Sequence, residues 1–384
     1  MIPYGRQSIS DADIQAVVDV LKSELLTQGP AIPAFEQAIC NYTNAEYGVA
    51  VNSGTSALHI ACLALGLGKG DVLWTTPTTF VASANCALYC GAEVDFVDID
   101  PLTWNMSVTN LEEKLIKAKK LKCLPKIIVP VHLCGLPCNM KRIKELSDEY
   151  GFFVIEDAAH AIGGRYHDTT IGSCSYSDIT IFSFHPVKTI TSGEGGMAVT
   201  NNKHLARKMG LFRSHGITRD DDLMTKKPDG LWYYEQVDLG FNYRMTDIQA
   251  ALGLSQFNRL DKFVQKRHYI AEQYSSLLSD LPIKSQLQPK GYYSGMHLYV
   301  IQLQLDKLTK SHRCIFEELR KNILVNLHYM PVHLQPWYKK MGFSEGDFPE
   351  SEEYYKRAIT IPCYPGLKDR ELHKVSEILH KVIK

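Results

Sequence analysis

Short apolar runs alternate with longer amphipathic stretches between about residues 47 and 215. Tyr47–Asn52 (YGVAVN) and Phe152–Glu156 (FFVIE) have the length and composition of buried strands, whereas Gly54–Leu65 (GTSALHIACLAL) has those of a helix. Strands that alternate with helices predict a mostly parallel sheet with helices on both faces. Further strands are predicted at Asp71–Thr75, Glu93–Ile99, Lys126–His132, Ile179–Phe184 and Met197–Thr200, and further helices at Val81–Tyr89 and near Met140–Tyr150.

The pattern changes after Met245. We expect a large α/β domain over residues 1–250, which includes an N-terminal arm, and a smaller α+β domain over residues 251–384. The second domain is predicted to contain a long helix at about Thr246–Ser276, strands at Tyr299–Leu305, Val325–His328 and Ile359–Ile361, and helices near Arg313–Lys321 and Lys368–Ile383.

The composition argues against several classes of function. The 384 residues include 42 basic and 42 acidic side chains, so the net charge is zero, which argues against a nucleic-acid surface or an anionic-membrane tether. The chain has no apolar run of membrane-spanning length and no signal peptide, so we expect a cytoplasmic protein. The ten cysteines lack zinc-site spacing, so free thiols are expected and no metal.

Polar residues at the strand ends carry the candidate chemistry, because ligands of parallel sheets bind there. Ser53, Gly54 and Thr55 follow the first strand and open a helix, which makes them either an anion site or an ordinary helix cap. Asp157 follows FFVIE and either pairs with a protonated ring nitrogen or only begins a helix.

Lys188 lies between a strand and the glycine-rich turn 193–196. Shielding by Phe184 would lower the pKa of its amine and suit it to Schiff-base chemistry, although a surface lysine is the simpler alternative. A possible anion site, an acid and a lysine follow one another in that order along the chain, and the last two are 188 − 157 = 31 positions apart. Together they describe a pocket for pyridoxal 5′-phosphate.

Longer strings of the sequence resemble the DegT/DnrJ/EryC1/StrS sugar aminotransferases, a family of fold-type-I pyridoxal-phosphate transferases. The resemblance runs essentially from end to end. Within the family, LLTQGP (25–30), SFHPVKTIT and NLHYMPVHLQPWY (326–338) most resemble the UDP-4-keto sugar aminotransferases of pseudaminic acid biosynthesis. The strings that carry the family resemblance are NSGTSAL (52–58), PTTFVASAN (77–85), VIEDAAHAIG (154–163), FSFHPVKTITSGEGGMAVTN (182–201), FRSHGI (212–217) and GFNYRMTDIQAALGLSQ (240–256).

The resemblance implies roles for individual residues. Lys188 would bind the cofactor covalently, Asp157 would pair with its ring nitrogen, and His160 would contact the ring face or the 3-oxygen. Phe80 would stack on the ring. Asn242 would cross the interface of a homodimer, so that the two active sites are shared. Phosphate contacts are implied for Gly54, Thr55 and Ser183, and nucleotide-sugar contacts for Tyr4, Glu24, Leu25, Leu26, Thr27, Asn326, Leu327, His328 and Tyr329.

The implied reaction moves an amino group from glutamate to the C4 ketone of a UDP-linked 4-keto-6-deoxy-N-acetyl-hexosamine. Three alternatives stay open: an aminotransferase of the 4-amino-arabinose or perosamine type, a pyridoxal-phosphate dehydratase, and a catalytically silent relative. Lys188 argues against the dehydratase, because the family's dehydratases replace this lysine with histidine. Tyr4, His328 and Tyr329 could equally serve only in packing.

Overall fold

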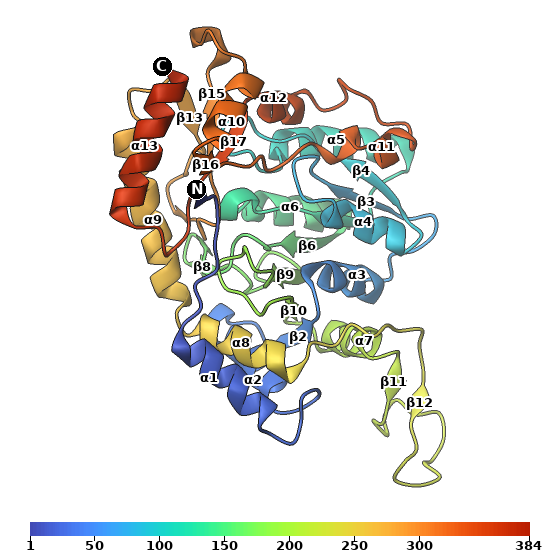
Figure 1. Cartoon of the computed structure of the whole chain (residues 1–384). Coiled ribbons are helices and arrows are strands. Elements are labelled where there is room, and N and C mark those ends of the chain that lie inside the picture. The colour runs from blue at the N-terminus through green and yellow to red at the C-terminus, as the bar shows by residue number, and fades with distance from the viewer.

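The computed structural model describes residues 1–384 and is built around a seven-stranded sheet (Figure 1). Only β10 runs antiparallel to its neighbours, so the expected mostly parallel sheet is confirmed. In spatial order the strands are β2 (Tyr47–Val51), β10 (Gly196–Thr200), β9 (Ile179–Ser183), β6 (Phe153–Asp157), β5 (Ile127–Val129), β3 (Val72–Thr75) and β4 (Glu93–Phe96).

Helices cover both faces of this sheet. Alternate residues of a strand point to opposite faces, so in β5 Ile127 and Val129 pack on one side and Ile128 on the other. One face carries α3 (Gly54–Ala64), α4 (Ala82–Tyr89) and α7 (Lys203–Arg213). The other carries α2 (Ala31–Thr43), α5 (Val108–Leu121), α6 (Met140–Tyr150) and α8 (Asp247–Phe257).

The C-terminal part has its own antiparallel sheet and a separate apolar core. The N-terminus joins this part, because β1 (Ile2–Pro3) pairs in parallel with β16 (Ile323–Leu324). The division of the chain near residue 250 stays a prediction. The sheet consists of β13 (Ile283–Ser285), β15 (Tyr299–Leu303) and β17 (Ala358–Ile361), and the helices packed on it are α9 (Leu260–Leu277), α10 (His312–Arg320) and α13 (Asp369–Ile383).

Two predicted elements are wrong. The long helix at Thr246–Ser276 is divided into α8 and α9, because Arg259 leaves the helical conformation and its guanidinium binds the carbonyl of Ser8 and the carboxylate of Asp13. The strand at Val325–His328 is absent: β16 ends at Leu324, and beyond it only Asn326 forms a bridge, to Thr360. His328 instead points its Nδ1 at the Thr360 hydroxyl, 2.8 Å away.

Several short elements complete the chain. A hairpin of β11 (Ile217–Thr218) and β12 (Glu235–Gln236) projects from the body at the lower right of Figure 1. None of the helices combines the length and apolar character that a membrane span needs. The remaining elements are α1 (Asp11–Leu21), α11 (Pro336–Lys339), α12 (Pro349–Arg357) and a small sheet of β7 (Arg165–Tyr166), β8 (Thr169–Thr170) and β14 (Tyr292–Tyr293).

Candidate active site

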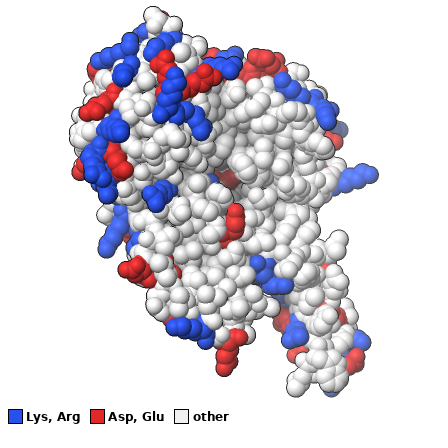
Figure 2. All heavy atoms as spheres, viewed as in Figure 1, with Lys and Arg blue, Asp and Glu red and all other residues white.

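A cavity of ≈ 830 Å³ opens at the carboxyl ends of β2, β6 and β9. Charged side chains of both signs are scattered over the face seen in Figure 2, without a large patch of one sign. Lys188 is the only lysine or arginine that lines the cavity. The cavity brings together the following residues that were singled out from the sequence: Ser53, Gly54, Thr55, Phe80, Asp157, His160, Ser183, Lys188, His328 and Tyr329.

The N-terminus of α3 forms one wall. Ser53 is extended and its hydroxyl caps the helix by accepting the N–H of Ser56 at 3.1 Å. The N–H groups of Gly54 and Thr55 begin the helix and have no helical partner, so they are free to bind an anion. A Cβ on Gly54 would lie 3.0 Å from the Cβ of Ser183, so this wall and the end of β9 approach closely.

Asp157 is buried at the end of β6. Its Oδ2 accepts a 2.6 Å hydrogen bond from the hydroxyl of Ser83, and its Oδ1 accepts the N–H of Ala159 at 3.1 Å. Two donors therefore hold a carboxylate that faces the cavity. Ser83 was missed from the sequence, because nothing in its helical surroundings marks it as a partner of an acid 74 residues away.

Lys188 lies in the loop after β9, where its N–H binds the carbonyl of His185 at 2.9 Å. Its amine makes no ion pair or hydrogen bond within the chain and faces the cavity. Burial lowers the pKa of this amine to about 8, against the opposing attraction of Asp157. Near neutral pH the amine therefore has an appreciable neutral fraction, which a nucleophile or a base requires.

An imidazole and a phenol also line the cavity, those of His160 and Tyr329. Tyr329 Oη lies 3.2 Å from His160 Nε2. Burial and the nearby Lys188 lower the pKa of both His160 and His328, the latter to about 3, so both rings are neutral. Burial raises the pKa of Tyr329, so its phenol keeps its proton. Tyr4 lies outside the cavity lining but packs on His328, with ring centroids 5.2 Å apart.

Other predicted residues lie at the rim or away from the cavity. Phe80 lines it but leaves 58% of its surface exposed. The exposed segment 24–27 lies against the start of α8, where Leu26 accepts the N–H of Asp247 and Thr27 bridges Thr246. Asn326 and Leu327 precede His328 without lining the cavity. Asn242 is exposed and also outside it.

Several lining residues were missed from the sequence. Gln249 belongs to a capping box, in which its side chain accepts the N–H of Thr246 at 2.9 Å. The Thr-x-x-Gln spacing could have located this helix start, but nothing local signals that it reaches the cavity. The other missed lining residues include Asn52, Thr79, Ser83 and Glu194.

These features fit pyridoxal 5′-phosphate. The unpaired N–H groups of α3 suit its phosphate, the buried carboxylate of Asp157 suits its protonated ring nitrogen, and the unpaired amine of Lys188 suits its aldehyde. The buried Nδ1 of His160 also has no partner within the chain.

Comparison with known proteins agrees with this geometry. A model of the DegT/DnrJ/EryC1/StrS aminotransferase family matches residues 7–380. The chain belongs to this family. Its members are pyridoxal-phosphate-dependent sugar aminotransferases, and the presence of Lys188 and Asp157 in one cavity accords with that chemistry.

Individual relatives match over their full length. The chain is 36% identical to the UDP-4-amino-4,6-dideoxy-N-acetyl-beta-L-altrosamine transaminase of Campylobacter jejuni, covering 100% of this chain and 98% of that protein. Among solved structures, Helicobacter pylori PseC, an aminotransferase involved in pseudaminic acid biosynthesis, has a TM-score of 0.89 at 30% identity, covering 99% and 98% of the two chains. A sugar aminotransferase from Streptococcus pneumoniae, solved in its pyridoxal-phosphate form, has a TM-score of 0.87 at 29% identity and covers both chains fully.

Proposed function

We propose that this aminotransferase moves the amino group of glutamate to the C4 ketone of a UDP-linked 4-keto-6-deoxy-N-acetyl-hexosamine, as in pseudaminic acid biosynthesis. The observation that carries the proposal is the full-length similarity to the Campylobacter jejuni transaminase, whose name specifies this kind of sugar. The similarity to PseC supports it independently.

Lys188 and Asp157 have distinct tasks in this reaction. Pyridoxal 5′-phosphate supplies an electron sink for the charge left when a carbon beside the amine loses its proton. The amine of Lys188, with a pKa of about 8, would take that proton and deliver it to the carbon on the other side of the nitrogen as a general acid–base. Asp157, held by Ser83 and Ala159, keeps a negative charge opposite the protonated ring nitrogen.

Binding energy comes from groups away from the reacting carbon. The N–H groups of Gly54 and Thr55, with Ser183, hold the cofactor phosphate, and Phe80 covers the ring. We infer that His328 and Tyr329, which line the cavity, bind the nucleotide sugar together with Tyr4, segment 24–27, Asn326 and Leu327, which lie outside its lining. Such remote contacts hold the ketone in place and raise the rate without touching the reacting atoms.

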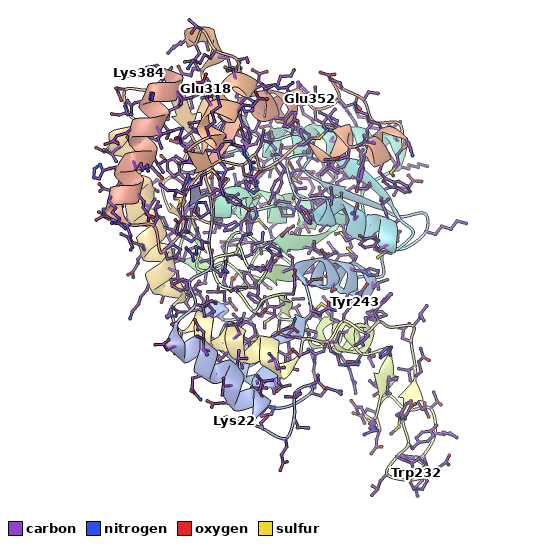
Figure 3. The ribbon with its side chains drawn as sticks, viewed as in Figure 1. Lys22, Trp232, Tyr243, Glu318, Glu352 and Lys384 are labelled. Atoms are coloured by element: carbon purple, nitrogen blue, oxygen red, sulfur yellow. The ribbon has the colours of Figure 1, made fainter.

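We also propose a homodimer with shared active sites. Asn242 supports this, because it is exposed and outside the cavity of its own chain, and it follows a projecting hairpin. In Figure 3 Trp232 lies at the tip of that hairpin and Tyr243 near its base. Leu231 and Trp232 are 100% and 74% exposed there, and contact with a second chain would bury these apolar side chains.

The deciding experiment incubates the holoenzyme with glutamate and UDP-4-keto-6-deoxy-N-acetyl-L-altrosamine and identifies the product by mass. An aminated sugar and 2-oxoglutarate are expected, and neither with Lys188→Ala. A panel with GDP-4-keto-6-deoxymannose and a UDP-4-keto-pentose tests the perosamine and 4-amino-arabinose alternatives. Faster amination of either of these sugars would refute the proposed substrate.

The dimer has its own test. Lys188→Ala and Asn242→Ala chains are inactive or weak alone, but a mixed dimer contains one site with both residues intact. Recovery of activity on mixing is expected if Asn242 acts in the partner's site. No recovery, with mixed dimers verified by native mass spectrometry, would refute sharing.

A further inference from the structure

Three thiols lie together where α3 and α4 pack side by side, outside the lining of the cavity (Figure 1). Cys62 belongs to α3, Cys86 belongs to α4, and Cys90 caps the C-terminus of α4. Because residues four positions apart lie on one helix face, Cys86 and Cys90 are neighbours on the same face of α4. Cys62 and Cys86 are fully buried in one apolar cluster, and the half-buried Cys90 packs against it.

The three thiols are close enough to change one another's acidity. Interaction with Cys86 and Cys90 is the main cause that raises the pKa of the Cys62 thiol, and burial adds to it. Interaction with Cys62 is the main cause that lowers the pKa of the Cys90 thiol, although burial opposes it. The negative charge therefore forms at the half-buried sulfur, whereas the buried Cys62 keeps its proton. A thiolate that solvent can reach is the reactive form of cysteine.

An imidazole lies beside Cys90 and also favours its thiolate. His59 is 5% exposed, and its ring centroid lies 5.4 Å from that of Tyr89, the residue before Cys90. Its Nδ1 faces the Oη of Tyr243 at 3.2 Å, and its buried Nε2 has no hydrogen-bond partner. His59 adds to the lowering of the Cys90 pKa. The C-terminus of a helix disfavours an anion, so the thiolate depends on these neighbours.

We propose that Cys90 and Cys62 form a peroxide-sensitive modification site, in which hydrogen peroxide converts the two thiols into a disulfide. The thiolate of Cys90 attacks one oxygen of the peroxide, the O–O bond breaks, and hydroxide leaves the new sulfenic acid. The sulfur of Cys62 then attacks that of Cys90, so that the S–S bond forms and the S–O bond breaks. The hydroxyl group leaves with the proton of Cys62 as water. In total the two thiols lose two electrons, and one peroxide becomes two waters.

The two helices connect this site to the cofactor pocket. Gly54 begins α3 at the cavity, and Ser83 in the first turn of α4 donates its 2.6 Å hydrogen bond to Asp157. The Sγ of Cys86 donates to the carbonyl of Ser83 at 3.3 Å. The sulfurs of a disulfide are about 2.0 Å apart, closer than two thiols in contact, so the bond draws the end of α4 toward α3. We expect the shift of α4 to weaken the hold of Ser83 on Asp157.

The first readout is disulfide mapping of the holoenzyme after treatment with hydrogen peroxide and alkylation of the remaining thiols. Lys69 is the only lysine or arginine between Cys62 and Cys90, so trypsin separates the two cysteines into peptides 23–69 and 70–114. A disulfide between them therefore links two peptides. Fragmentation of the linked pair distinguishes Cys62 from Cys40 in the first peptide, and Cys90 from Cys86 in the second.

Three variants test the assigned roles. Cys90→Ser removes the attacking thiol, so no linked pair is expected. Cys62→Ala removes the second thiol, so the sulfenic acid of Cys90 should accumulate and be trapped by dimedone. His59→Phe keeps the ring and removes its nitrogens, so it should slow the alkylation of Cys90 by iodoacetamide. The exposed Cys123 gives the matched control, because Cys123→Ser should form the linked pair as wild type does.

The second readout is the rate at which the diluted holoenzyme loses the visible absorbance of its cofactor. The linked enzyme should lose it about tenfold faster, the size of effect expected when a hydrogen bond to a charged group is lost. Dithiothreitol should restore the original rate, and peroxide should leave the rate of Cys90→Ser unchanged. Absence of the linked pair in wild type, a link through Cys40 or Cys86 instead, or an unchanged rate in the linked enzyme would overturn the proposal. Neither readout needs the sugar or the amino donor, so both are decided separately from the amination assay.

Discussion

Removal of one hydroxyl group tests the role of Asp157 without touching its carboxylate. Ser83→Ala deletes the 2.6 Å hydrogen bond to Oδ2 and leaves only the N–H of Ala159 on this side chain. A hydrogen bond to a charged group contributes about 1.5–3 kcal/mol. If the electron sink depends on this carboxylate, losing the hydrogen bond raises the activation free energy by a similar amount. Each 1.36 kcal/mol of activation free energy is about a tenfold change in rate. We therefore expect the rate constant of the half-reaction with glutamate to fall by about one to two orders of magnitude.

The assay is single-turnover kinetics with saturating glutamate, followed through the visible absorbance of the bound cofactor. Ser147→Ala is the matched control, because Ser147 is also buried and donates a 2.6 Å hydrogen bond, to the carbonyl of Phe152 far from the cavity. The control should lose about 1 kcal/mol of stability and keep its rate. A Ser83→Ala enzyme that retains cofactor and turns over within about twofold of wild type would contradict the reasoning.

Three further predictions concern stability and cofactor binding. The pKa of the Lys188 amine is 10.5 in the unfolded chain and about 8 in the folded one, so its burial destabilises the apoprotein fully below pH 8 and less as the pH rises to 10.5. Lys188→Met should therefore raise the free energy of unfolding of the apoprotein at pH 7 by at most about 3 kcal/mol, measured by urea unfolding. This gain should shrink above pH 8. His132→Ala removes the 2.8 Å partner of buried Glu156 and should cost about 3–5 kcal/mol, measured in the same way; a loss under 1 kcal/mol would contradict this. Gly54→Ala adds a methyl group 3.0 Å from Ser183 and should weaken cofactor binding by only about 1 kcal/mol in a fluorescence titration, since the N–H donors remain.

The central sheet could be predicted because each of its strands carries its own local signal. β5 is a continuous apolar run, β6 begins with one, and α6 between them has a clear apolar face. The break at Asn258–Arg259 could not be predicted, because it depends on contacts between Arg259 and residues 8 and 13, about 250 positions away. The hydrophobic pattern continues across this break.

The residues of the candidate site likewise fall into those that the sequence could predict and those that it could not. Residues at strand ends, such as Asp157 and Lys188, could be found because parallel strands end at one edge of the sheet. Residues that meet them from elsewhere could not: Ser83 reaches Asp157 from inside α4, and Gln249 reaches the cavity from the start of α8. Their local sequences are those of ordinary helices, so their contacts follow only from packing.

The two parts of the chain depend on each other at the site. The sheet supplies Asp157 and Lys188, but the groups opposite them come from the loop after β16, which the N-terminus holds in place by pairing β1 with that strand. Tyr4 extends this contact, since its carbonyl accepts the N–H of Cys363 while its ring packs on His328. Arg267 binds the carbonyl of Cys363 as well. A change in the first four residues therefore acts on Tyr329 and His160 through backbone contacts, and truncation of the N-terminus should impair catalysis even where it removes no group that touches the cofactor.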